Sequence, residues 1–388
     1  MTAARSDHDA PTTSPGWAAR SVSARLPDFP WDRLTSYADR ARGHDDGVVD
    51  LSVGTPVDPT PEVVQKALAA ATDSPGYPMT VGRPDTRQAC IDWLARRFGV
   101  TGLDLDAVLP VVGSKELISG LAGHLGVGPG DLVVYPALAY PTYEVGAVLA
   151  GARTVATDSL TSLGPERVSV VWVNSPSNPT GRMLPVEHLR KVVDWCRERG
   201  ALLVSDECYI EMAWEPVDGQ GPVSALHPDV CGGDHTGILT VHSLSKRSNL
   251  AGYRCAFVAG DPAVVGELLA VRKNLGLMMP GPQQRAMAAA IDDDEHVAEQ
   301  RARYARRRGE LKTAFESCGF RVDHSQASLY LWMTRGEPCW DTVGWLADQG
   351  ILVAPGEFYG RAGSEHVRVA FTATDERVAA AVRRLTQS

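Results

Sequence analysis

The sequence lacks the features that mark a membrane protein or a nucleic-acid-binding protein. It has no run of about eighteen apolar residues, so we expect no membrane-spanning helix. The formal net charge of −9 argues against nucleic acid or an anionic membrane as the main partner. Lysine is scarce, with six in 388 residues, and one of these, Lys246, follows the apolar, strand-like run 237–243.

Cysteine is too scattered to build a disulfide framework or a zinc site. The seven cysteines include no Cys-x-x-Cys pair and lie at Cys90, Cys196, Cys208, Cys231, Cys255, Cys318 and Cys339. An odd number without ligand spacing favours free thiols in a reducing, cytoplasmic environment. We therefore expect a cytoplasmic protein without a metal, in which Cys208 is a packed small side chain and not a nucleophile.

The composition, 44% apolar and 22% charged, is that of a globular protein with a sizeable core. Strand-like runs alternate with helical stretches, which predicts an α/β fold whose mainly parallel sheet is covered by helices on both faces. A charged helical stretch over 295–315 then leads into further apolar runs, which predicts a smaller α+β domain. Residues 1–24 are expected to be a disordered leader and not a signal peptide. The expected strands of the main sheet span about 107–112, 131–135, 168–174, 201–206, 237–243 and 254–259.

The run Ser243-Leu-Ser-Lys246-Arg-Ser-Asn-Leu-Ala-Gly-Tyr-Arg254 combines a primary amine with hydroxyls and a guanidinium. Such a set suits a cofactor that carries a carbonyl, to which the amine can bond, and a phosphate, as pyridoxal phosphate does. Ser-x-Ser-Lys is also common in surface loops, so an ordinary loop is the alternative.

Two upstream strand-like runs also end in polar residues. The run 168–174 leads into a Pro-rich turn that contains Asn178, and the run 201–206 ends at Asp206, with Tyr209 three residues later. In open α/β sheets, ligands bind outside the carboxyl ends of the strands. We therefore expect these side chains and Lys246 to meet at one rim of the sheet.

From about residue 27 to its C-terminus, the chain resembles the fold-type-I, class I/II pyridoxal-phosphate aminotransferases. The segments around Asn178, Asp206 and Lys246 occur in the order typical of that family. The resemblance implies that Lys246 bonds to the cofactor and that Asp206 keeps the pyridinium nitrogen protonated. It also implies that Tyr209 and Asn178 bind the phenolic oxygen of the cofactor ring.

The resemblance further implies the surroundings of the cofactor and of the substrate. Tyr140 is expected to stack on the ring and Arg368 to hold the substrate α-carboxylate, with Asn178 and Gly54 beside the substrate. A homodimer is implied, in which Tyr77 reaches the partner's cofactor phosphate. The phosphate of the same subunit is assigned to Ser243, Ser245, Arg254 and the backbone of Gly113, Ser114 and Lys115. The implied domains are a large cofactor-binding domain, 53–284, and a small domain, 285–388, which the segment 25–52 joins.

The residue types suit these roles. A carboxylate beside a protonated pyridinium must stay ionised, so that cation is expected to depress the pKa of Asp206. The amine of Lys246, once freed, is a natural base for moving a proton at the substrate Cα. Helix N-terminal amides near Ser114 offer donors to a phosphate. Arg368 can hold a carboxylate through two parallel hydrogen bonds.

Each assignment also has an ordinary structural alternative. These alternatives are a helix cap or surface carboxylate for Asp206, packing for Tyr209 and Tyr140, a plain helix start at Gly113-Ser114, pairing of Arg368 with Glu365 or Glu357, and a turn position for Tyr77.

Within the family, three segments look like the actinobacterial-type N-succinyldiaminopimelate aminotransferases, namely 26–32, 49–59 and 327–332. The similarity implies exchange of an amino group between N-succinyl-LL-diaminopimelate and 2-oxoglutarate in lysine biosynthesis. Both substrates carry a distal carboxylate that needs a cation, and Arg272, Lys273 and Arg83 are the candidates. Arg272 is alternatively a solvated charge at a helix end. The loop 79–87 departs from the expected Thr-Pro-x-Leu-Arg pattern, which leaves the side-chain specificity open.

Other functions remain compatible with the same residues. Another pyridoxal-phosphate aminotransferase, or a β-eliminating C–S lyase, would use the same Lys246 and Asp206. A non-catalytic regulator of this fold would need a basic winged-helix segment ahead of it, and the few scattered arginines of the leader do not supply one.

Overall fold

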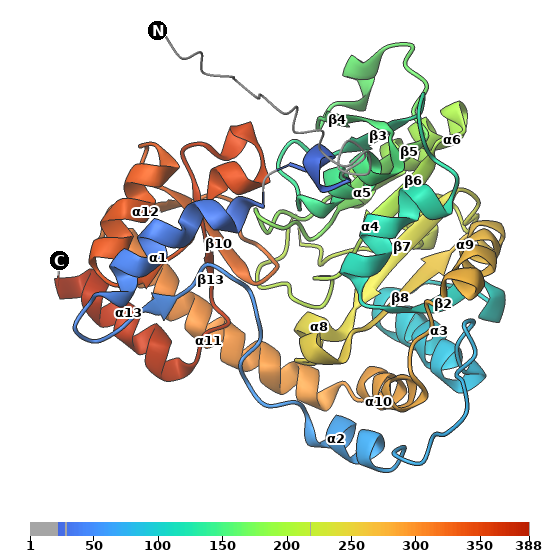
Figure 1. The fold of residues 1–388 in the computed structure, drawn as a ribbon, viewed down its shortest axis with the longest axis horizontal. Coiled ribbons are helices and arrows are strands. Elements are labelled where there is room, and N and C mark those ends of the chain that lie inside the picture. Colours follow the sequence, from blue (N-terminus) through green and yellow to red (C-terminus); the bar gives the residue numbers. More distant parts are fainter. Residues whose placement is uncertain (1–21, 28, 218, 388) are drawn as a thin grey trace, which may run out of the picture.

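The computed structural model describes residues 22–27, 29–217 and 219–387, and its main features are a large sheet and a small sheet (Figure 1). Residues 1–21 of the expected leader lie outside the described residues, and Ser23–Arg25 form the short 3₁₀ helix η2. No helix among the described residues is long and apolar enough to cross a membrane.

The large sheet has seven strands in the order β2-β8-β7-β6-β5-β3-β4. The strands from β4 to β7 in this order are parallel to one another, and β8 runs antiparallel to both of its neighbours. The prediction of a mainly parallel α/β sheet is therefore confirmed. The strands are β2 (Val108–Val112), β3 (Leu132–Tyr135), β4 (Arg153–Ala156), β5 (Val170–Asn174), β6 (Leu202–Asp206), β7 (Ile238–Ser243) and β8 (Cys255–Gly260).

Helices cover both faces of this sheet because its strands are apolar on both sides. Along β6, Leu203 and Val204 are both fully buried but belong to different clusters of core side chains. One cluster includes residues of α3, α6 and α10, and the other includes residues of α4, α5 and α9. The helices on this side of the molecule are α2 (Glu62–Ala69), α3 (Pro84–Phe98), α4 (Ser114–His124), α5 (Thr142–Ala150), α6 (Val186–Arg199), α7 (Pro228–Cys231), α8 (Leu244–Arg247), α9 (Pro262–Leu275) and α10 (Gly281–Asp292).

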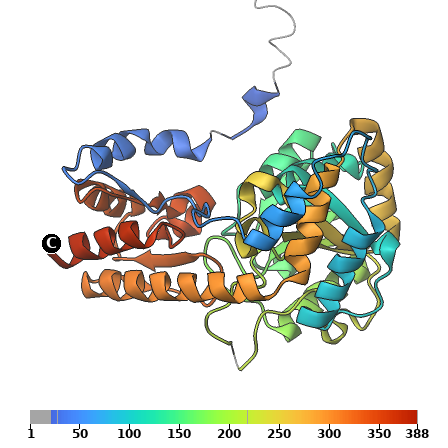
Figure 2. The same cartoon turned by 90° about the horizontal axis from the view of Figure 1, so that it is seen from below.

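The small sheet is antiparallel, in the order β12-β13-β10-β9. A separate parallel pair, β1 with β11, joins the N-terminal segment to the C-terminal part of the chain. A third cluster of core side chains unites residues from Leu34 to Leu51 with residues from Val297 to Leu385. The long helix α11 runs along this part of the molecule beside α13 (Figure 2). These elements are α1 (Thr35–Arg42), β1 (Val49–Asp50), α11 (Glu295–Ser317), β9 (Arg321–Val322), β10 (Tyr330–Thr334), α12 (Cys339–Asp348), β11 (Ile351–Leu352), β12 (Ala354–Pro355), β13 (Val367–Ala370) and α13 (Asp375–Gln387).

Candidate active site

A cavity of about 590 Å³ lies where β6 and β7 of the large sheet end, and the small sheet supplies part of its wall. Most of the predicted site residues line it, although they are far apart in the chain. These residues are Gly54, Ser114, Lys115, Tyr140, Asn178, Asp206, Tyr209, Ser243, Ser245, Lys246, Arg254 and Arg368. We call this space the main cavity.

Asp206, the last residue of β6, is a buried carboxylate whose partners are all neutral. Its oxygens accept hydrogen bonds from the Tyr143 hydroxyl at 2.6 Å and from the backbone amide of Cys208 at 3.1 Å. Burial raises the pKa of Asp206, and these hydrogen bonds oppose the rise. A cation beside this carboxylate would lower the same pKa. The site therefore fits the protonated ring nitrogen of pyridoxal phosphate.

Lys246 lies in the short helix α8, and its Nζ donates to the carbonyl oxygen of Gly54. Burial lowers the pKa of this amine, and the nearby charges of Arg368 and Arg254 lower it further. A depressed pKa increases the fraction of neutral amine, which is the form that acts as a nucleophile or a base.

Arg368, on β13, crosses from the small sheet into the main cavity. Its Nη1 donates to Asn178 Oδ1 at 2.8 Å and its Nη2 to the carbonyl oxygen of Ser52 at 2.7 Å, whereas its Nε has no hydrogen-bond partner among the described residues. It is 97% buried, since only 3% of its surface is exposed, and it has no acidic partner in the part of the chain described. The alternative pairing with Glu357 does not occur, because that carboxylate bonds to Arg33 and Trp340. A buried guanidinium without a carboxylate is suited to a substrate carboxylate.

Donors for a phosphate also line the main cavity. Ser243 Oγ donates to Ser245 Oγ at 3.0 Å, and the guanidinium of Arg254 lies against the backbone of Gly113. A Cβ at Gly113 would lie 1.9 Å from Arg254 Nη2, and this glycine has a φ of +84°. Gly113 precedes α4 and has no side chain that could accept hydrogen bonds from the first amides of this helix. Hydroxyls, a guanidinium and free helix amides together fit the phosphate of the cofactor.

Five predicted residues do not line the main cavity, namely Gly113, which lies against Arg254, and Arg272, Lys273, Arg83 and Tyr77. Arg272 is fully buried and pairs with both oxygens of Glu116 at 2.8 Å, so it is neither a solvated helix-end charge nor a cation facing the main cavity. Arg83 pairs with Asp85 at 2.6 Å. Tyr77 is 98% exposed, so it does not pack within its own subunit.

Several residues of the site were missed in the sequence. Tyr330 lies between Arg368 and Tyr209: the guanidinium of Arg368 lies 3.9 Å from the centre of its ring, and its hydroxyl is 3.0 Å from that of Tyr209. Phe29 and Trp31 give the main cavity an aromatic part of its wall. Neither role has a local signal, because each depends on contacts between segments that are distant in the chain.

The family model for "Aminotransferase class I and II" matches residues 46–385. A probable aminotransferase of Mycobacterium tuberculosis is 61% identical, over 95% of this chain and 87% of that protein. The 4-dedimethylamino-4-oxo-anhydrotetracycline transaminase OxyQ of Streptomyces rimosus is 60% identical, over 93% of this chain and 99% of that protein.

Solved structures agree with the sequence matches. An aminotransferase from Neisseria meningitidis superimposes with a TM-score of 0.85 at 30% identity, covering 95% of this chain and 98% of that one. A probable N-succinyldiaminopimelate aminotransferase from Thermus thermophilus gives a TM-score of 0.81 at 26% identity, over 92% and 99% of the two chains. With these matches and a main cavity suited to the cofactor, the chain belongs to the class I and II aminotransferases, which depend on pyridoxal phosphate.

Proposed function

We propose that the main cavity catalyses transamination of N-succinyl-LL-diaminopimelate with 2-oxoglutarate, and that Lys246, Asp206 and Arg368 do its essential work. The observation that carries the catalytic part is the arrangement of these three groups around one cavity of about 590 Å³. The substrate is a finer inference. It rests on the similarity of segments 26–32, 49–59 and 327–332 to that subgroup, and on the name of the Thermus relative.

In this proposal, the described residues hold the cofactor and move one proton. Ser243, Ser245 and Arg254 bind the phosphate, with the amides that follow Gly113. Tyr140 packs against the ring, and Asn178 and Tyr209 donate to its phenolic oxygen. When bound, pyridoxal phosphate withdraws electrons from the substrate Cα and carries the amino group between the two substrates.

Asp206 and Lys246 then have different acid–base roles, and Arg368 orients the substrate. Asp206 stays ionised against the ring nitrogen, because a cation there counteracts the burial that raises its pKa. Burial lowers the pKa of Lys246 Nζ. This amine takes a proton from Cα of the amino acid in the first half-reaction and delivers a proton to Cα of the oxo acid in the second. Arg368 fixes the α-carboxylate, so that the Cα–H bond faces the amine.

We propose Lys115 as the cation for the distal carboxylate, in place of Arg272. Its side chain lines the main cavity, with Nζ 6.0 Å from the centre of the Tyr140 ring. Arg272 already forms a buried ion pair with Glu116, so it is not available to a substrate. Arg83 stays a candidate only from a partner subunit.

The test is the visible spectrum of the purified holoenzyme before and after addition of N-succinyl-LL-diaminopimelate. The proposal expects the yellow band to bleach and then to return when 2-oxoglutarate is added. A band that ignores this substrate but bleaches with glutamate would overturn the substrate and keep the aminotransferase. A pyruvate-forming reaction that needs no amino acceptor would indicate a C–S lyase instead.

A second substrate class is favoured by the aromatic wall of the main cavity. Phe29 and Trp31, with ring centres 5.8 Å apart and ring planes inclined by 34°, offer an aromatic, apolar surface. Such a surface suits a polycyclic ketone of the kind named for the Streptomyces relative. Amino transfer to a tetracyclic ketone, without any response to N-succinyl-LL-diaminopimelate, would select this alternative.

We also propose a cytoplasmic homodimer in which Tyr77 completes the partner's site. The 98% exposure of Tyr77 and the seven free cysteines support it. The division into a large domain over 53–284 and a small one made by 25–52 with 285–388 is supported by the separate core cluster that unites the latter two segments.

A further inference from the structure

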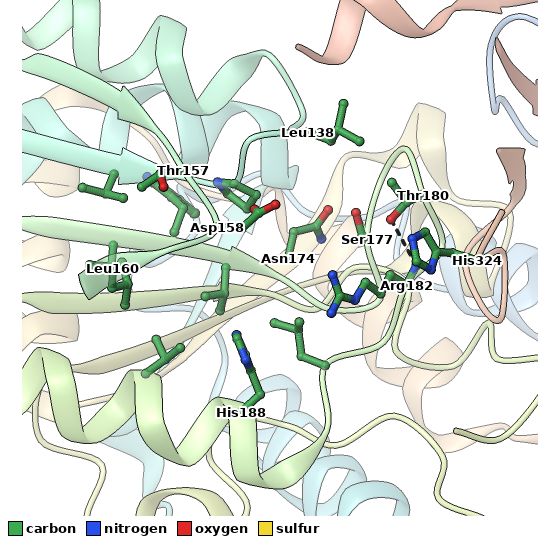
Figure 3. Close-up of a pocket in the computed structure, with 17 residues that line it drawn as sticks. Leu138, Thr157, Asp158, Leu160, Asn174, Ser177, Thr180, Arg182, His188 and His324 are labelled. Atoms are coloured by element: carbon green, nitrogen blue, oxygen red, sulfur yellow. Dashed lines mark hydrogen bonds between the residues drawn. The ribbon is translucent and has the colours of Figure 1, made fainter. Parts of the chain in front are cut away.

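A second cavity, of about 300 Å³, opens at the carboxyl ends of β3, β4 and β5, beside helix α6 (Figure 3). It shares no lining residue with the main cavity. We call it the outer cavity. Its size is at the lower end of the range for small-molecule sites. Its polar side chains include Asp158, Asn174, Arg182, His188 and His324, and apolar residues such as Val134, Leu160 and Val192 form the floor.

Two opposite charges of the outer cavity do not pair with each other. Arg182 lies in the turn after β5, and its guanidinium makes no hydrogen bond or ion pair to any described residue. Asp158, beyond the end of β4, accepts only the backbone amide of Ala137, at 3.0 Å, within the described chain. Both line the same space without meeting (Figure 3). Both side chains are exposed to solvent, so a ligand with a negative and a positive end replaces water at both charges.

Two imidazoles, those of His188 and His324, supply further hydrogen-bonding groups in the outer cavity. Burial, followed by the charge of Arg182, lowers the pKa of His188 and that of His324. Neutral imidazole carries one donor and one acceptor, so these rings can bond a carboxylate without adding charge. Arg182 is then the cation that selects the anionic end.

The wall of the outer cavity is connected to the substrate-binding arginine. Asn174 accepts from the backbone amide of Asn178 at 2.7 Å, and Asn178 in turn accepts from Arg368 at 2.8 Å. His324 belongs to a loop of the small-sheet side that is tied to the turn by Ser325 N and the carbonyl oxygen of Thr180, 2.8 Å apart. These hydrogen bonds give a ligand that holds this turn and this loop together a route to Arg368.

We propose that the outer cavity binds a small zwitterion with an apolar side chain, of the α-amino-acid type, as a regulatory ligand. Its carboxylate lies at Arg182, its ammonium group at Asp158, and its side chain on the apolar floor. Because ligand coupling between two sites is reciprocal, occupancy alters the affinity of the main cavity for carboxylate substrates.

The test uses 1-aminocyclohexane-1-carboxylate, which has no hydrogen on Cα and so is not transaminated. Its binding to the holoenzyme is measured by titration calorimetry for the wild type, R182Q, D158N and R368K. Loss of a charge-assisted contact is expected to raise Kd at least about tenfold in R182Q and D158N. R368K is expected to retain this binding, with a change in Kd no larger than the coupling of about fivefold, because Arg368 does not line the outer cavity.

The matched control is K191Q, which removes an exposed charge of helix α6, beside the outer cavity but not in its lining. Its Kd should equal that of the wild type. The probe should change KM for the amino-acid substrate about fivefold in the wild type and K191Q, and leave it unchanged in R182Q. Binding that R182Q retains and R368K loses would overturn the proposal. Binding that depends on Arg182 but not on Asp158 would overturn the zwitterion assignment.

Discussion

At the scale of single residues, Glu207 follows Asp206 directly but does not line the main cavity. Its Oε1 accepts the backbone amide of Ala225 at 2.8 Å, and its Oε2 has no hydrogen-bond partner among the described residues. The nearest ring nitrogen, His242 Nε2, lies 3.6 Å from that oxygen. Burial raises the pKa of Glu207 to about 7 and lowers that of His242 to about 3. Glu207 is therefore predicted to bind a proton near neutral pH, next to Asp206, the carboxylate that we propose holds the cofactor.

We predict that Glu207→Gln removes a pH-dependent loss of stability. The pKa of Glu207 rises on folding from its usual value of 4.5 to about 7, so its proton favours the folded state. That contribution is fully present below about pH 4.5 and is lost as the pH rises through about 7. Relative to E207Q, the wild type should lose up to about 3 kcal/mol of unfolding free energy across this window. Urea unfolding of both holoproteins at several pH values measures it.

The exposed carboxylate Glu187, at the start of α6, provides the control. The curve of stability against pH for E187Q should follow that of the wild type. Parallel curves for the wild type and E207Q would contradict the prediction.

At the scale of elements, α11 connects parts of the chain that are distant in sequence. Arg307, in the middle of this helix, is 3% exposed and binds both oxygens of Asp58 at 2.7 Å. Its Nε also donates to Asp375, at the start of α13, at 2.6 Å. One buried guanidinium thus joins the loop before α2 to two helices of the small-sheet side.

We predict that Arg307→Ala lowers the unfolding free energy by about 3 kcal/mol, because it leaves the largely buried Asp58 without its cation. Arg306 is the matched control. It is the preceding residue, it also pairs with Asp375, at 2.5 Å, but its side chain is 52% exposed. R306A should cost less than about 1 kcal/mol. Chemical denaturation distinguishes the two, and equal losses would show that burial does not govern this network.

Buried elements could be predicted from sequence better than exposed ones. Six strands of the large sheet lie within about two residues of their expected positions, because each is a continuous apolar run. The edge strand β4 was missed, since Arg153 and Ala156 are exposed and its pattern is not apolar. The antiparallel direction of β8 is set by pairing with distant strands and has no local signal. Arg272 was misread for the same reason, as its partner Glu116 is 156 residues away.

At the scale of the whole molecule, the site of one subunit leaves Tyr77 unused. The loop between α2 and α3 exposes 98% of Tyr77 and 57% of Met79. Large exposed apolar side chains that lie close together favour an interface with another chain. A second copy of the chain, related by a twofold axis, would bring two such loops to two cavities.

We predict that inactive Y77A and K246A subunits restore each other's activity when they are mixed. In a hybrid dimer, the site built on the intact Lys246 receives Tyr77 from the K246A partner, whereas the other site carries both defects. Random pairing makes half of the dimers hybrids, so the mixture should recover about a quarter of wild-type activity. If Tyr77 instead served its own subunit, each site of the hybrid would keep one defect and the mixture would stay inactive. Steady-state assays after the subunits are unfolded and refolded together distinguish the two outcomes, and separately refolded Y77A and K246A supply the baseline.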